Sequence, residues 1–241
     1  MRATSVIYRR ELGAYLRSPF SWAIAALVLL VDGIFFQGFA MRGEQLSATV
    51  LERFFYFSSG VTMGAGLLLS FRLINEERTN HSMVLLNTSP VRDSHIVVGK
   101  FLAAATFLLF LLAISIYMPL LIKVRGKVSF SQIMVGYMGL MLIGCSAMAI
   151  GTFASTLARN QLVAGFVALV ILIIMVFLFQ FARALEGNVR DVLQELDMWW
   201  IHFQNGFMRG VLNLKDVIFY LALTYFFLLL AVKTLEAKRW Q

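Results

Sequence analysis

Residues 162–181 read LVAGFVALVILIIMVFLFQF and contain no charged side chain. A helix of about twenty residues rises roughly 30 Å, which is the thickness of the hydrocarbon layer of a bilayer. Lipid offers no partner for backbone N–H and C=O groups, so a stretch that crosses this layer must be helical. The stretch therefore predicts a membrane-spanning helix.

Five further apolar runs lie along the 241-residue chain: 20–40, 54–71, 96–124, 133–155 and 217–232. Charged residues make up 14% of the chain, against roughly a quarter in an ordinary soluble domain. We therefore expect an all-α, polytopic membrane protein with six transmembrane helices in a single domain over residues 1–241. The run 96–124 is long enough to tilt or kink, and Pro119 predicts where the kink falls.

Residues 1–19 predict a helix that lies flat in the headgroup region before the first span. Apolar side chains share one side of this helix, and arginines lie elsewhere around it: Tyr8, Leu12, Tyr15 and Leu16, and Arg2, Arg9, Arg10 and Arg17. Ser18-Pro19 then ends the helix. The alternative is a plain positively charged flank. No cleavage pattern follows, so we expect a retained anchor and no cleaved signal peptide.

The distribution of basic residues predicts that both ends of the chain lie in the cytoplasm. In this orientation the inner segments hold twelve Lys and Arg residues and the outer segments nine. Basic residues favour the cytoplasmic side, and the N-terminal arginines contribute most of the bias. Because basic residues stand between apolar runs rather than along one soluble face, we expect no nucleic-acid binding.

Small residues indicate where helices approach one another closely. Gly60 and Gly64 form a G-x-x-x-G spacing, and Ala147, Gly151 and Ser155 form a second row of small residues. Such rows serve packing within one chain or contact between two copies, and the sequence leaves both interpretations open.

Asp32 is the only acidic residue deep within a predicted span, with Gln37 about a turn and a half further along. A carboxylate in lipid is costly, so Asp32 and Gln37 are candidates for a polar translocation path. The alternative role for Asp32 is a hydrogen-bonded packing residue.

The remaining candidates for chemistry do not assemble into one site. His81 and His95 fall in the inner loop and His202 in an outer segment, so we expect surface or interfacial roles for them rather than a metal site. Cys145 is the single cysteine, which excludes an internal disulfide. We expect no catalytic residues, no metal and no resident cofactor.

The inner loop over residues 72–99 reads RLINEERTNHSMVLLNTSPVRDSHIVVG. Charged residues precede an apolar patch over 83–86, and Ser89-Pro90 ends the pattern. We expect a short amphipathic helix and a turn that lie against the inner membrane face. A loop that serves only as a connection is the alternative.

The run from Glu76 to Lys100 resembles the first cytoplasmic loop of ABC-2-type permeases, especially the gliding-motility-associated group and the related nitrous-oxide-reductase maturation permeases. These show a pattern close to E-E-R-x-x-G-T-x-E-L-L-L-T-x-P-V, then G-K-F. The matching residues are Glu76, Glu77, Arg78, Leu85, Leu86, Thr88, Pro90, Val91, Gly99, Lys100 and Phe101. The residues that depart from the pattern are His81, Ser82, Val84 and Asn87.

Three further stretches resemble the same family in the expected order. Glu11-Leu12 with Ser18-Pro19 is similar to its opening K-E-L-x-x-x-x-x-S-P. Residues 151–161 resemble its G-x-F-x-S-S-L-x-x-N-Q, and residues 210–220 resemble its G-V-x-x-x-x-D-x-x-Y. Together these stretches cover most of the chain.

The resemblance implies a permease subunit whose energy comes from a partner. In such permeases the first cytoplasmic loop inserts into a cleft on a separate ATPase, which makes residues 72–95 the expected coupling loop. The expected contacts combine apolar anchors with charges: Glu76, Glu77, Arg78, Met83, Leu85, Leu86 and Pro90. The sequence has no G-x-x-x-x-G-K-[ST] motif, so we expect ATP and Mg to bind the partner ATPase.

The resemblance also implies the partners and the location. The partners are ABC ATPase subunits, a second copy or a related permease, membrane lipid and, in gliding-type systems, an auxiliary membrane subunit with a large outer domain. A dimer is expected because paired ATPases need paired docking loops. The expected location is a bacterial inner membrane. The alternative function is an ion- or proton-coupled carrier, which ordinarily has repeated halves with several intramembrane ionisable residues.

The outer segment over residues 182–215 resembles the short re-entrant helices that related permeases have between their last two spans. Its first half spaces apolar residues on one helical face: Val189, Val192, Leu193 and Leu196. Four aromatic residues follow and are predicted to line or close the outer mouth: Trp199, Trp200, Phe203 and Phe207. The alternative is a surface helix with no part in transport.

Overall fold

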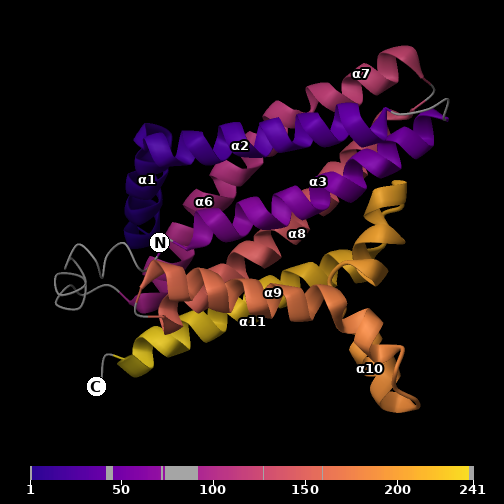
Figure 1. Cartoon of the computed structure of the whole chain (residues 1–241). Helices are drawn as coiled ribbons and strands as arrows, with labels where there is room; N and C mark the ends of the chain where they lie inside the picture. Colours follow the sequence, from indigo (N-terminus) through magenta and orange to yellow (C-terminus); the bar gives the residue numbers. More distant parts are fainter. Residues whose placement is uncertain are drawn as a thin grey trace.

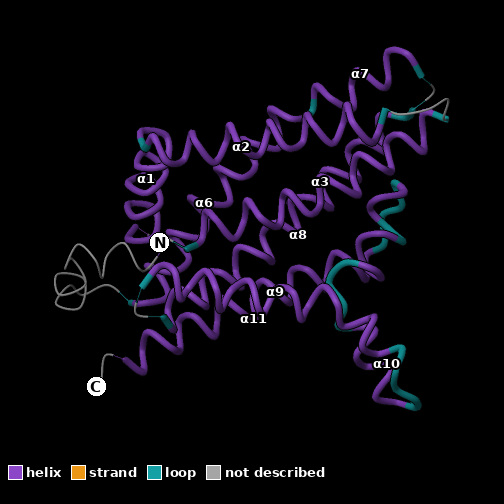
Figure 2. Tube along the Cα trace, viewed as in Figure 1, coloured by secondary structure: helices purple, strands orange, loops and turns teal. Residues whose placement is uncertain are grey.

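The computed structural model describes residues 2–41, 46–71, 73, 92–126, 128–158 and 160–238, and within these ranges it is built of helices joined by turns (Figures 1 and 2). The long helices run side by side between two ends of the molecule. α1 (Arg2–Arg17) starts at one end, where α11 (Leu214–Lys238) also finishes. We call this end the inner end and the opposite one the outer end.

Five helical stretches of the described chain are long and apolar enough to cross a membrane: Pro19–Ala40, Asp93–Val124, Phe130–Leu157, Gln161–Ala182 and Leu214–Lys238. They correspond to α2 (Pro19–Phe35) with the short π-helix η1 (Phe36–Ala40), α6 (Asp93–Ser115) with α7 (Tyr117–Arg125), α8 (Phe130–Leu157), α9 (Gln161–Ala182) and α11. Five of the six predicted runs are thereby confirmed as helices with the properties of spans.

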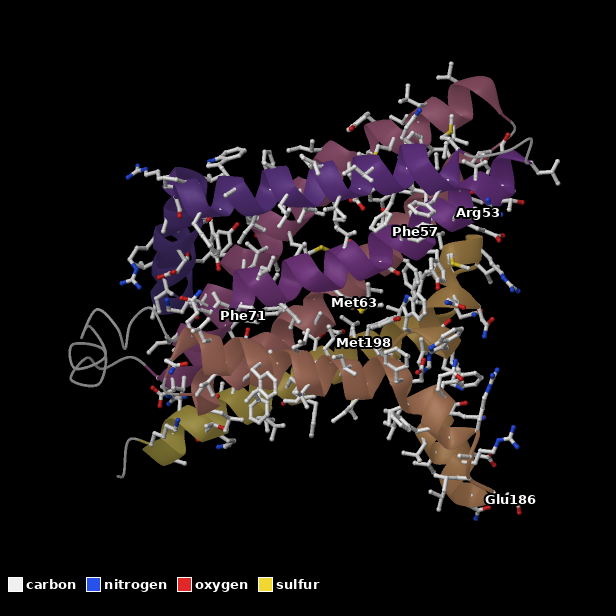
Figure 3. All side chains as sticks on the ribbon, viewed as in Figure 1. Arg53, Phe57, Met63, Phe71, Glu186 and Met198 are labelled. Carbon is white, nitrogen blue, oxygen red and sulfur yellow. The ribbon has the colours of Figure 1, made fainter. Side chains whose placement is uncertain are left out.

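The remaining predicted run lies in α3 (Ser47–Ser70), which is not among those five stretches. Serine, threonine and glycine lower the hydropathy of α3, yet its 24 residues rise about 36 Å. Figure 3 places Arg53 near the outer end and Phe71, just beyond the helix, near the inner end. α3 packs mainly against α8, so its small polar residues face helices rather than lipid.

Glycines let α3 and α8 approach closely at positions other than the predicted G-x-x-x-G pair. A Cβ atom at Gly66 would lie 2.6 Å from the carbonyl oxygen of Gly144. A Cβ atom at Gly60 or Gly64 would meet no heavy atom within 4 Å in the described chain. Of the two interpretations left open by the sequence, the described helices therefore do not support packing within the chain at Gly60 and Gly64, and contact between copies is untested for them.

Both predicted breaks in the helices are confirmed. Ser18 has an extended backbone and Pro19 opens α2, so α1 turns and lies across the inner end (Figure 1). α6 gives way to α7 around Ile116, and Pro119 follows three residues later. Proline has no N–H to donate to the carbonyl of Ser115, which explains why the α-helix is interrupted in the preceding turn.

Candidate functional site

The predicted contacts of the coupling loop lie outside the described residues: Glu76, Glu77, Arg78, Met83, Leu85, Leu86 and Pro90. The structure describes what flanks them. Leu73 is buried just after α3, and Asp93 is buried at the start of α6. The loop is therefore joined at both sides to helices that pack in the core of the molecule.

α1 is attached to the first turns of α6 by polar contacts. Lys100 Nζ lies 3.1 Å from Glu11 Oε1, and the lysine side chain is only 3% exposed. One turn towards the start of α6, Thr4 Oγ1 and His95 Nδ1 lie 2.9 Å apart. α1 thus holds the helix that follows the coupling loop.

The charged pair at this contact determines the titration of Glu11. Burial alone would raise the pKa of the Glu11 carboxyl, but the charges of Lys100 and Arg10 and their hydrogen bonds lower it. The lowering outweighs the rise, so the pKa of Glu11 lies below its ordinary value. Glu11 is therefore ionised at neutral pH and forms a true ion pair with Lys100.

Asp32 and Gln37, the candidates for a translocation path, have different environments. Asp32 is buried in α2 and accepts a hydrogen bond from Ser58 Oγ of α3 at 2.9 Å. Gln37 lies in the short π-helix η1 and is exposed. The bond to Ser58 ties α2 to α3.

The outer segment begins with a helix that leaves the bundle. α10 (Asn188–Glu195) has no buried residue and projects away from the long helices (Figure 1). Its apolar side is exposed at Val189 and Val192. Figure 3 shows Glu186 at the tip of this projection and Met198 back within the bundle.

Asp197 fixes the point at which the chain returns to the bundle. Its carboxylate accepts backbone N–H bonds from Trp199 and Trp200 on the returning segment and from Phe179 of α9. Burial raises the pKa of Asp197, and these N–H donors act against that rise. Asp197 thus caps the start of the returning segment and also accepts a backbone hydrogen bond from α9.

The four aromatic residues predicted at the outer mouth follow this cap. Trp199 Nε1 donates to Ser59 Oγ of α3 at 2.8 Å, and Trp200 stacks on Phe179. Phe203 and Phe207 are fully buried. The four residues therefore fasten the returning segment to the bundle, and their part in a gate remains a prediction.

Sequence reasoning was wrong about His202, which was expected in a surface or interfacial role. Its imidazole is 1% exposed, with Nδ1 at 2.7 Å from Asp216 Oδ1 and Nε2 at 3.0 Å from the carbonyl oxygen of Glu195. Asp216 also accepts a hydrogen bond from Asn213. His202 thus joins the end of α10 to the start of α11.

Nothing in the sequence indicated that these residues form one cluster. Residues 210–220, which include Asp216, resemble a family pattern, but no feature linked Asp216 to His202. The partners of His202 are a carboxylate on another helix and a backbone oxygen, and neither forms a short motif with it. In the described part of the chain no three His, Cys, Asp or Glu side chains are placed to hold a metal ion.

Comparison with known families identifies the chain. Residues 5–224 match the family described as ABC-2 family transporter protein. The chain belongs to the ABC-2 transporter family. It is therefore a multi-pass membrane subunit of an ABC-2 transporter and a non-catalytic permease domain. A comparison with curated proteins finds no match.

Membership in the ABC-2 family implies an ATPase partner. An ABC-2 permease partners with an ABC ATPase, and the permease domain itself is non-catalytic. Two groups of described polar contacts in this ABC-2 subunit lie at its ends: Glu11–Lys100 at the inner end and the Asp197 and His202 contacts at the outer end. Asp32 with Ser58 lies between them along α2 and α3.

Proposed function

We propose that the chain is the permease half of an ATP-driven ABC-2 exporter, coupled to cytoplasmic ATPase subunits through residues 72–95. The observation that carries this proposal is the family match over residues 5–224. The gliding-motility-associated group is the proposed subgroup, and it rests on the sequence patterns of the coupling loop and the three further stretches.

The proposal includes six spans with both termini in the cytoplasm. Its support is the length of α3, about 36 Å, and its position alongside the other long helices. An even number of crossings returns the C-terminus to the side of the N-terminus, and both ends of the described chain lie at the inner end (Figure 1). The basic residues of the inner segments favour the cytoplasm for that side.

In this proposal α1 lies in the membrane interface and moves together with α6. Closure of two ATPases around nucleotide would displace the coupling loop, and the displacement would reach α6 directly because α6 begins at Asp93. The Glu11–Lys100 pair joins α6 to α1, so the displacement of α6 would also move α1. Support comes from the extensive packing of α1 against α6, which exceeds its packing against α2.

The proposed complex contains two permease chains, two ATPases and, in the gliding-type arrangement, an auxiliary membrane subunit with a large outer domain. The proposed location is a bacterial inner membrane. Asp32 and Gln37 are the proposed polar positions of the path. Trp199, Trp200, Phe203 and Phe207 are proposed to shape its outer mouth, since the segment that carries them sits at the outer end.

The test is co-purification of the chain with candidate ATPases and measurement of ATPase stimulation in vesicles. Replacing the apolar anchors Met83, Leu85 and Leu86 with serine is expected to abolish both. The matched control replaces the exposed Val189 and Val192 of α10 with serine, which changes apolar residues at the opposite end and is expected to leave both intact.

Two results would contradict the proposal. One is complex formation and stimulation that survive the loss of the three anchors. The other is substrate movement driven by an ion or proton gradient without nucleotide, which would favour the carrier.

A further inference from the structure

The imidazole of His202 has a hydrogen-bond acceptor at each of its two ring nitrogens. Nδ1 lies 2.7 Å from Asp216 Oδ1, and Nε2 lies 3.0 Å from the backbone carbonyl oxygen of Glu195. A neutral imidazole has one N–H and can donate to only one of these oxygens. Forming both bonds requires one more proton, either on the ring or on the Asp216 carboxyl. The geometry therefore corresponds to a pair that holds this additional proton.

The surroundings of the ring favour its positively charged form. Asp216 is buried, and its second oxygen accepts a hydrogen bond from the neutral amide of Asn213 at 3.1 Å, so the imidazole supplies the compensating charge. The imidazole also stacks on Phe219, with ring centroids 3.8 Å apart, and an aromatic face attracts a cation. The carbonyl of Glu195 is at the end of α10, where a helix favours positive charge.

The other charged or titratable groups on the elements around His202 make contacts elsewhere. These are Lys215 with the Glu195 carboxylate, the Tyr220 hydroxyl with the carbonyl of Met198, Asp197 with backbone N–H groups, Arg183 over the ring of Phe179, and Arg209, which is exposed in the 3-10 turn η3 (Phe207–Arg209). In the described part of the chain, Asp216 is therefore the charged group bonded to the imidazole.

We propose that His202 and Asp216 form a proton-dependent latch between the end of α10 and the start of α11. When the additional proton leaves, the remaining N–H stays with the carboxylate, because a charged acceptor forms the stronger bond. The carbonyl of Glu195 then loses its donor. α10 has no buried residue, so loss of this cap loosens the end of the helix.

The latch would make the outer segment sensitive to the pH on the side that the outer end faces. Imidazole side chains ordinarily gain and lose their second proton between about pH 5 and 8. Acidification over this range would fasten α10 to α11, and a rise in pH would release it. This regulation lies beyond the proposed function and does not depend on coupling to an ATPase.

The experiment measures hydrogen exchange of the α10 amides in the full chain in lipid nanodiscs from about pH 5 to 8, corrected for the intrinsic pH dependence of exchange. We expect protection to fall roughly five- to thirtyfold as the pH rises, the size expected for losing a charged cap at a helix C-terminus. Asp216→Asn keeps an acceptor for the ring but removes the charge, so the fall should move to lower pH.

The matched control is Glu195→Gln, which makes the same change from carboxylate to amide in the exposed pair with Lys215 and keeps the backbone carbonyl. It is expected to preserve the pH at which protection falls. Equal protection of α10 across the pH range in the unaltered chain would overturn the proposal. So would an Asp216→Asn profile that matches that of Glu195→Gln.

A second measurement leaves the latch itself unaltered. The chain has three histidines, so replacing His81 and His95 with glutamine makes His202 the single histidine. Nitrogen NMR of the labelled ring should show both nitrogens protonated at the acidic end of the range, with the second proton lost as α10 protection falls. A ring with a single N–H throughout the range would contradict the latch.

Discussion

Replacing Glu11 with glutamine should release α1 from α6. The change removes the carboxylate that lies 3.1 Å from a lysine only 3% exposed, and the side chain of Glu11 itself is 15% exposed. Loss of one partner of a fully buried pair costs about 3–5 kcal/mol, and a hydrogen bond to a charged group about 1.5–3 kcal/mol. Because Glu11 keeps some contact with solvent, we expect a loss of about 2–3 kcal/mol.

The assay is hydrogen exchange of the amides of α1, because the loss concerns the attachment of one helix. A free energy of 2–3 kcal/mol corresponds to roughly 30- to 140-fold faster exchange when α1 opens as a unit. The matched control is Glu236→Gln, which breaks the exposed pair with Lys233 and should change exchange little. Similar exchange of α1 in the two variants would refute the reasoning.

The same pair predicts the pH dependence of this attachment. The pKa of Glu11 is lower in the folded protein than its ordinary value of 4.5. Between these two values the folded state binds fewer protons than the unfolded state, so stability rises with pH in that window. The stabilisation by the Glu11–Lys100 pair is complete at pH values above the ordinary pKa of Glu11. It is lost as the pH falls through the lowered pKa of Glu11 in the folded protein. Protection of α1 amides should therefore fall on acidification in the unaltered chain but not in Glu11→Gln.

Three further predictions concern the core, the outer segment and the path. Gly66→Ala should lower the free energy of unfolding in detergent by about 1–3 kcal/mol, because the new Cβ atom would meet the backbone of Gly144. Gly64→Ala on the same helix should be tolerated. Asp197→Ala should cost about 2 kcal/mol and speed proteolysis of the outer segment, because backbone N–H groups lose their acceptor. Asp32→Asn keeps an acceptor for Ser58 and should assemble normally, yet lower transport; unchanged transport would remove Asp32 from the path.

The sequence predicted the long helices well because lipid leaves a spanning segment little choice of structure. An apolar run in a membrane must satisfy its backbone internally, so length and composition were sufficient. Pro19 and Pro119 acted locally, through a fixed backbone angle and a missing N–H, and their effects could be placed to within a few residues.

Properties that depend on which helices meet could not be predicted in the same way. Gly60, Gly64 and Gly66 look alike in sequence, and only the position of α8 makes Gly66 the close contact. His202 gave no sign of burial, because its partners are a carboxylate of α11 and a backbone oxygen at the end of α10. Spacing along the chain carries no information about such contacts across helices.

The two kinds of contact suggest which parts of the molecule move together. α3 and α8 meet backbone to backbone at Gly66 and Gly144, and such packing tolerates almost no sliding. α1 and the segment after α10 are joined to their neighbours by side-chain packing together with directional bonds, at Glu11 and Asp197. A few such bonds can be exchanged while the helices stay intact. We therefore expect motion in transport to concentrate in α1 together with α6 and in the segment after α10, with the α3–α8 pair as the rigid frame against which they move.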